Sequence, residues 1–145
     1  MLIFMEITRV FVDTNYFLAL LNPQDSLHVR ALDLAKRIED PKLSLVVSNL
    51  ILLESVTLLA MKRGRQVAIE FGEYLQNNKR IKIVQVDDEI QKKTWEIFKK
   101  VGVKDVSYVD CSILAVMQTE GISTLVSFDK HFVDLKKIAK YKIIN

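Results

Sequence analysis

Residues 10–15 read VFVDTN, in which a short apolar run ends at Asp13 and a segment with helical spacing of its apolar residues begins. The same succession recurs along the chain, so short apolar runs alternate with longer helical segments. The predicted strands are residues 9–12, 45–47, 81–86, 124–126 and 142–144, and the predicted helices are residues 15–21, 27–38, 50–61, 66–76, 89–101 and 109–119. Strands separated by helices favour right-handed crossovers. The pattern therefore predicts a three-layer α/β domain, with a parallel sheet covered by helices on both faces.

The length and composition favour one folded domain over residues 1–145. A chain of 145 residues is close to the commonest domain size, and an apolar content of 50% is enough for a substantial core. Cys111 is the single cysteine, which excludes an internal disulfide framework and, without a spaced set of Cys and His, a structural zinc site. A lone thiol is typical of a reducing cytoplasm.

The N-terminal sequence has no pattern of an export or membrane signal. The apolar residues 1–4, MLIF, are soon followed by Glu6 and Arg9. This run is too short for a signal peptide and far short of the roughly 20 residues of a membrane helix. We therefore expect a cytoplasmic protein without membrane contact. Because the regular pattern begins near Thr8, either Met1 or Met5 suits the first residue.

Four acidic residues take positions that matter in this fold class. Asp13 and Asp129 follow predicted strands, in VFVDTN and TLVSFDKHF, and Asp110 lies near the start of a helix in VSYVDCSILAVM. Working sites of parallel sheets lie beyond the carboxyl ends of the strands. Glu54 lies in LILLESVTLLAM, a helix that is apolar nearly all round and is therefore expected to be buried. A buried carboxylate is costly unless it is paired or binds a metal, so we expect one pocket to gather all four acids.

Each acid also has a structural interpretation. Asp13 suits an N-cap of the following helix, Asp129 suits a turn or cap, and Glu54 suits a buried salt bridge. Ser107 and Asp110 have the three-residue spacing of a capping box, a role that is compatible with a site. A further acidic cluster, residues 87–89, precedes a helix and is interpreted as capping alone.

The residue types in the predicted pocket favour a particular cofactor. Four carboxylates in one cleft repel one another unless a cation lies among them. Oxygen ligands without a His or Cys cluster select a hard divalent cation, Mg²⁺ or Mn²⁺. Such a site is typical of enzymes that cleave phosphodiesters or otherwise handle phosphate.

On these motifs the chain resembles the PIN-domain nucleases and, among them, the VapC toxins. The resemblance is carried by VFVDTN, by the inward Glu54, by SYVDCS at Asp110 and by LVSFDKHF at Asp129, and it spans about residues 8–144. It implies a three-layer α/β/α domain, a five-stranded parallel sheet in the order 3-2-1-4-5, and metal-dependent endoribonuclease activity. It also implies a homodimer and, for the toxins, a small antitoxin protein as partner.

The resemblance assigns roles to individual residues. The family's catalytic acids correspond to Asp13, Glu54, Asp110 and Asp129. Of these, Asp13, Asp110 and Asp129 are expected to hold one or two Mg²⁺ or Mn²⁺ ions, and Glu54 or Asp129 to orient or deprotonate the attacking water. The supporting residues are Thr14 and Ser127, whose hydroxyls lie beside the first and last acids, and Asn15, which is expected to cap the first helix. Local turn bonding is the alternative role of the two hydroxyls.

Basic residues supply candidate contacts to RNA. They are Lys62, Arg63 and Arg65 in the run MKRGR, and Lys130 beside Asp129. A solvated surface is the alternative interpretation of each. Without the four acids, 21 basic residues face 14 acidic ones, so a net charge of only +3 is compatible with a basic surface around an acidic pocket. Leu18, Leu21 and the helices of residues 27–76 offer apolar edges for a dimer or an antitoxin, and the sequence does not separate these uses.

Other function classes compete with a toxin-type ribonuclease. One is a PIN-domain RNA-processing nuclease without an antitoxin. Another is a receiver-like signalling domain that accepts phosphate, although Asp13 lacks the neighbouring acid expected of a receiver and Glu54 has no place in such a domain. The last is a relative without catalytic activity that serves as a binding module, although all four acids are present.

Overall fold

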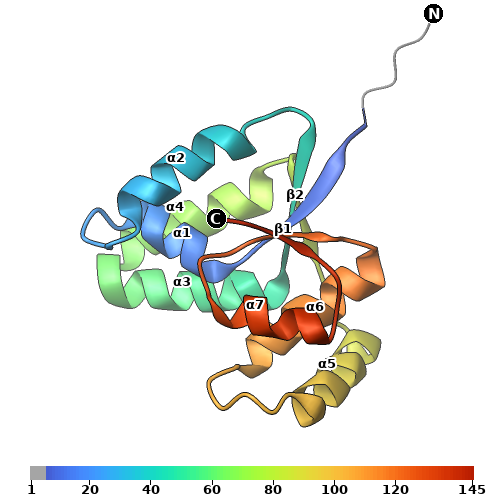
Figure 1. Cartoon of the computed structure of the whole chain (residues 1–145). Coiled ribbons are helices and arrows are strands. Elements are labelled where there is room, and N and C mark those ends of the chain that lie inside the picture. The colour runs from blue at the N-terminus through green and yellow to red at the C-terminus, as the bar shows by residue number, and fades with distance from the viewer. Residues whose placement is uncertain (1–5) are drawn as a thin grey trace, which may run out of the picture.

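The strand that precedes Asp13 lies at the centre of the sheet. In the computed structural model, which describes residues 6–145, five parallel strands follow the order β3-β2-β1-β4-β5 (Figure 1). They are β1 (Thr8–Val12), β2 (Leu43–Ser48), β3 (Ile81–Val84), β4 (Thr124–Val126) and β5 (Lys142–Ile144). This order confirms the expected sheet. It differs from the order 2-1-3-4-5 of receiver-type domains, so the receiver interpretation is wrong.

Helices cover both faces of the sheet. They are α1 (Thr14–Leu21), α2 (His28–Ile38), α3 (Asn49–Arg63), α4 (Arg65–Asn77), α5 (Asp88–Lys100), α6 (Tyr108–Glu120) and α7 (His131–Asp134). Because crossovers between parallel strands are right-handed, α1 to α4 lie on one face and α5 to α7 on the other (Figure 1). The short α7 and the 3-10 turn Leu135–Lys137 after it were not predicted from the sequence.

The third strand is shorter than predicted, because the chain leaves the sheet at Val84 instead of residue 86. The backbone N–H of Val86 donates to the Asn49 side chain at 2.7 Å and not to a neighbouring strand. A side chain at the start of α3 therefore ends the strand by taking its donor.

The expectation that α3 is buried nearly all round is wrong. Ile51, Ser55 and Leu59 are buried, but Leu53 is 66% exposed and Met61 is 78% exposed. Helix α6 is the one buried on all sides over much of its length, since every residue from 111 to 117 is buried. Glu54 therefore lies at the edge of the core and not inside it.

Within residues 6–145, no helix is long and apolar enough to cross a membrane. The expectations about the apolar segment 1–4 and about Met1 or Met5 as the first residue concern a part of the chain outside the described residues.

Candidate functional site

The register of the sheet brings the first and last acidic motifs together. Val12 of β1 lies opposite Val126 of β4, and the Asp13 N–H donates to the Val126 carbonyl at 2.9 Å. The next residues, Asp13 and Ser127, then lie side by side at the carboxyl edge. The Ser127 hydroxyl donates to Asp13 Oδ2 at 2.8 Å. Two motifs more than a hundred residues apart thus form one corner of the site.

Asp13 is both a helix cap and a member of this acidic corner. Its Oδ1 accepts the Thr14 N–H at 2.7 Å, and Asp13 is the N-cap of α1. The structural and functional interpretations of this residue are therefore compatible.

Asn15 does not cap α1, which corrects the prediction. Its Oδ1 accepts the Phe128 N–H at 3.2 Å, and its Nδ2 donates to Ser127 Oγ at 3.4 Å. Asn15 therefore joins the start of α1 to the loop that follows β4 and holds the two motifs in place.

The surroundings of Asp13 disfavour its negative charge. Burial raises the pKa of Asp13 to about 7, and the charges of Asp110 and Asp129 contribute to the rise. The hydrogen bonds from Ser127 and from the Thr14 backbone act in the opposite direction. A buried carboxylate with two acidic neighbours is a group that a cation would stabilise in its charged form.

Asp110 combines a capping box with proximity to the other acids. The Asp110 N–H donates to Ser107 Oγ at 3.0 Å, and the Ser107 N–H donates to Asp110 Oδ2 at 2.9 Å, which confirms the capping box. Burial is the main cause that raises the pKa of Asp110, and the charge of Asp129 adds to the rise. The hydrogen bonds with Ser107 lower this pKa, and so does the positive charge of the neighbouring His131.

Glu54 approaches the same acids from α3. Partial burial raises its pKa, and the charge of Asp110 raises it further. The buried hydroxyl of Thr14 faces Glu54 and opposes this rise, although the two side chains form no hydrogen bond of normal geometry. Electrostatic influence therefore connects all four predicted acids through Asp110.

His131 is a further neighbour of the acids, which the sequence analysis did not count among the site residues. Its imidazole Nδ1 lies 2.8 Å from Asp129 Oδ1, and its backbone N–H donates to the same oxygen at 2.9 Å. The Asp129 N–H in turn donates to Ser127 Oγ at 3.0 Å. The sequence places His131 only two residues from Asp129, and the contact depends on the unpredicted helix α7.

The donor set suits a hard divalent cation, because the acids and the hydroxyls beside them offer only oxygen. Within residues 6–145, no Lys or Arg forms an ion pair with any of the four acids. However, no three Asp, Glu, His or Cys side chains in this part of the chain are close enough to hold one ion together. The chemistry is therefore suitable, and shared binding of one ion requires some of these side chains to rotate inward.

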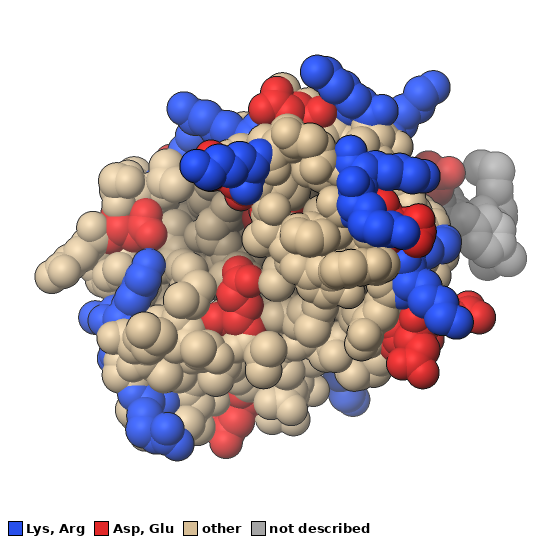
Figure 2. All heavy atoms as spheres, turned by 90° about the horizontal axis from the view of Figure 1, so that it is seen from below, with Lys and Arg blue, Asp and Glu red and all other residues tan. Residues whose placement is uncertain are grey.

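The predicted RNA contacts divide into two places. Lys130 is exposed and follows Asp129 directly, at the rim of the acidic corner. Lys62, Arg63 and Arg65 are exposed at the junction of α3 and α4, which begins about 12 Å along the helix axis beyond Glu54. Seen from below, acidic side chains lie around a hollow near the middle of the molecule, and Lys and Arg lie toward its edges (Figure 2).

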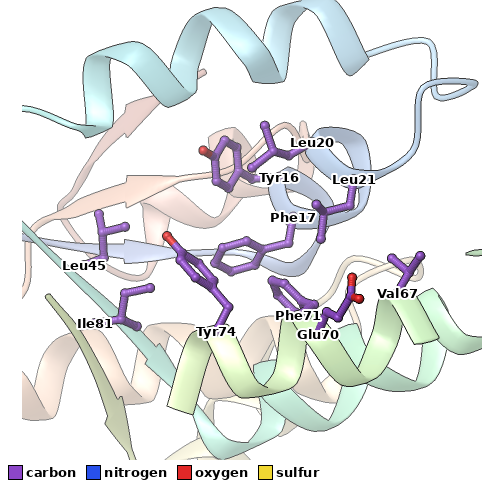
Figure 3. A pocket seen from close by; sticks show the side chains of 10 residues that line it. All are labelled: Tyr16, Phe17, Leu20, Leu21, Leu45, Val67, Glu70, Phe71, Tyr74 and Ile81. Atoms are coloured by element: carbon purple, nitrogen blue, oxygen red, sulfur yellow. The ribbon is translucent and has the colours of Figure 1, made fainter. Parts of the chain in front are cut away.

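A separate apolar groove of about 330 Å³ lies between α1 and α4 (Figure 3). Its lining residues are Tyr16, Phe17, Leu20, Leu21, Leu45, Val67, Glu70, Phe71, Tyr74 and Ile81. The predicted apolar edge at Leu21 is part of it, whereas Leu18 is not. None of the four site acids lines the groove, so it is distinct from the acidic corner.

Comparison with known proteins gives consistent matches. A family model described as the PIN domain matches residues 10–138. The chain is 30% identical over 124 residues to the 23S rRNA-specific endonuclease VapC20 of Mycobacterium tuberculosis. The aligned residues are 85% of this chain and 91% of that protein. It is 32% identical over 123 residues to a VapC ribonuclease of Archaeoglobus fulgidus, with 83% of this chain and 77% of that protein covered.

Solved structures agree with these matches. The crystal structure of M. tuberculosis VapC20, described as a sarcin-ricin loop cleaving toxin, has a TM-score of 0.78 and 27% identity, over 86% of this chain and 93% of that chain. VapBC2 from Rickettsia felis, bound to a promoter DNA fragment, has a TM-score of 0.63 at 18% identity over 95% and 98% of the two chains, which shows a shared fold. The sheet order, the four acids and a family model over most of the sequence lead to one conclusion: the chain belongs to the PIN domain family.

Proposed function

We propose that this protein is a metal-dependent endoribonuclease that hydrolyses RNA phosphodiester bonds as the toxin of a toxin-antitoxin pair. The observation that carries the proposal is the buried carboxylate of Asp13 at the carboxyl edge of the sheet, held by the Ser127 hydroxyl and within electrostatic influence of Asp110 and Asp129. The names of its relatives support the proposal, since VapC20 is described as an rRNA endonuclease and the A. fulgidus protein as a ribonuclease.

Asp13, Asp110 and Asp129 are the residues that would hold Mg²⁺ or Mn²⁺, as one or two ions. When bound, the cation supplies positive charge that polarises the scissile phosphate and lowers the barrier to attack by water. Ser127 fixes the orientation of Asp13 through its hydroxyl, and Asn15 fixes the position of Ser127.

Glu54 is the better candidate to orient water and accept its proton. It is partly exposed, and its raised pKa brings its basicity closer to neutral pH, as general-base catalysis requires. Asp129 is the alternative base, but one of its oxygens already faces both the N–H and the imidazole of His131. The proposed hydrolysis needs no nucleophile from the protein.

Basic residues around the acids would bind the phosphates of the RNA. Lys130, which is exposed, would contact a phosphate close to the acidic corner, and the exposed Lys62, Arg63 and Arg65 would contact the RNA strand further away. Such contacts are independent of base sequence and weaken with salt.

The groove in Figure 3 is the proposed binding place of the antitoxin. Its lining is apolar apart from Glu70 and the two tyrosine hydroxyls, which suits a segment with large apolar side chains. Support comes from solved relatives of the same fold that are described as toxin-antitoxin complexes, including one from Klebsiella pneumoniae. Homodimer formation through the exposed apolar residues of α3 and α5 is a further proposal. An RNA-processing nuclease without an antitoxin is the alternative, and a search for a small adjacent gene distinguishes the two.

The test of the activity is RNA cleavage with and without Mg²⁺ or Mn²⁺. The wild type is expected to cleave only with the metal, and Asp110→Asn to lose at least about 100-fold in rate. The amide oxygen introduced by this substitution still accepts the Ser107 N–H, so the capping box survives in part. Asp87→Asn is the matched control, because Asp87 caps α5 away from the site. A wild type that cleaves no RNA with either metal would contradict the proposal and favour a binding module.

A further inference from the structure

Arg30 is a basic residue beside the acidic corner that the sequence did not single out. It lies in the first turn of α2 and is exposed. Its guanidinium carbon lies 5.4 Å from the centroid of the Phe128 ring, within the range of a cation–π contact. Helix α2 therefore contacts the loop that carries the last acid of the site.

Phe128, which contacts Arg30, is itself held in a defined position. It lies between Ser127, which binds Asp13, and Asp129. Its N–H donates to Asn15, and its ring packs against the Tyr16 ring with centroids 6.4 Å apart. Because both its backbone and its ring are held by α1, the position of the guanidinium is defined relative to the acids.

The charge of Arg30 is available to a ligand. Within residues 6–145, Arg30 forms no ion pair with an acidic side chain. A cation–π contact does not neutralise the guanidinium, and the N–H groups of a guanidinium match the oxygens of a phosphate. The contact also restricts the side chain beforehand, so that less entropy is lost when a ligand binds.

We propose that Arg30, supported by Phe128, binds a phosphate of the single-stranded RNA that enters the acidic corner, and thereby positions the strand. This inference rests on the proposed function, because it takes RNA as the ligand. It assigns the rim at Phe128 as a second phosphate contact, in addition to the one proposed for Lys130.

The test measures binding of a short fluorescein-labelled single-stranded RNA by anisotropy at several salt concentrations. All proteins carry Asp129→Asn, so that the probe is not cleaved. Adding Arg30→Ala is expected to raise Kd at least about 5-fold and to reduce the slope of log K against log salt by about 0.7. Arg30→Lys should recover the binding only in part, because lysine keeps the charge but not the planar guanidinium that matches a phosphate.

Lys36→Ala is the matched control. Lys36 is exposed on the same helix, about 120° around the axis from Arg30, and its loss should change Kd less than about 2-fold. Equal changes in Kd for Arg30→Ala and Lys36→Ala would overturn the inference. It would also be overturned if the protein with Asp129→Asn alone binds no RNA. Cleavage by the protein without Asp129→Asn is measured separately. If the protein cleaves RNA but Arg30→Ala does not change binding, only the role of Arg30 is contradicted. If binding depends on Arg30 but the protein cleaves no RNA, only the proposed nuclease activity is contradicted.

Discussion

At the scale of single residues, Asp13 shows how one carboxylate serves both the fold and the site. One oxygen caps α1 through the Thr14 N–H, and the other accepts the Ser127 hydroxyl. Asp110 likewise completes a capping box while it faces Asp129. In both cases the local hydrogen bonds fix the direction of a side chain that would otherwise be repelled by its neighbours.

The raised pKa of Asp13 predicts that the metal-free protein loses stability as pH rises. Asp13 is protonated in the folded state up to about pH 7 but only up to about pH 4 in the unfolded state. Stability from this group is thus complete below about pH 4 and is lost between there and about pH 7. The loss is at most about 4 kcal/mol, at about 1.4 kcal/mol per pKa unit.

Urea unfolding in EDTA across this pH range measures the effect. Asp13→Asn keeps an acceptor for the Thr14 N–H but does not ionise, so its stability should fall much less with pH than that of the wild type. The residual fall in the variant reports Glu54 and Asp110, whose pKa values are raised in the same direction. If the stability of the wild type and of Asp13→Asn falls equally with pH, ionisation of Asp13 is not a cause of the fall.

Ser127 is predicted to be more important than its small size indicates. Ser127→Ala removes the donor to Asp13 and the acceptor of the Asp129 N–H, both in a buried position. We expect a loss of about 1–3 kcal/mol in the free energy of unfolding, together with slower RNA cleavage.

Ser123→Ala is the control for this change. Ser123 is exposed just before β4, and its substitution should leave both quantities nearly unchanged. If Ser127→Ala behaves like this control, the hydrogen bonds of Ser127 do not organise the site.

At the scale of elements, α3 shows where sequence patterns lose information. Its apolar residues surround the helix, so periodicity gives no direction, and complete burial was the natural expectation. The helix instead leaves Leu53 and Met61 exposed, because α1, α4 and the sheet cover only part of its surface. The direction of Glu54 is therefore set by packing and not by the apolar pattern.

A pair of leucine substitutions tests this orientation of α3. Leu59 is fully buried, so Leu59→Ala should lower the free energy of unfolding by about 2–5 kcal/mol. Leu53→Ala removes the same atoms from an exposed position and should change it by about 0.5 kcal/mol or less. Urea unfolding of both variants is the measurement, and equal losses would place Glu54 on a different face of the helix.

At the scale of the whole molecule, the sequence predicted the layers and most of the strands and helices, because short apolar runs and helical spacing are local signals. The order of the strands came from the family resemblance. The sequence also predicted that one pocket gathers the four acids, since carboxyl ends of parallel strands share one edge. The structure brings them within electrostatic influence of one another, but no three of the described acidic side chains are close enough to hold one ion.

The contacts that the sequence did not predict join elements far apart in the chain. Asn15 binds the loop at Phe128, Asn49 takes the N–H of Val86, and Arg30 covers the Phe128 ring. Each depends on strand register and helix placement, which no local pattern contains. For Asn15, the sequence led to the wrong prediction of a helix cap.

The distribution of charge predicts a salt-sensitive enzyme. Apart from the four acids, 21 basic residues outnumber 14 acidic ones, so RNA should be attracted at a distance and bound mainly through phosphates. Lys130→Ala, next to the acids, should lower kcat/KM for RNA more than Lys62→Ala, and the difference should shrink at high salt. A larger loss of kcat/KM for Lys62→Ala would instead indicate that the RNA lies over the junction of α3 and α4.

Asp13, Asp110 and Asp129 are proposed to form, with Glu54 near them, one site for a divalent cation. Mn²⁺ binding, followed by electron paramagnetic resonance of the free ion, tests it without any assumption about the substrate. The wild type is expected to bind one or two ions and Asp13→Asn to bind at least about 10-fold more weakly, whereas Asp87→Asn should bind like the wild type. A wild type that binds no Mn²⁺, or Asp13→Asn that binds it equally well, would contradict the claim.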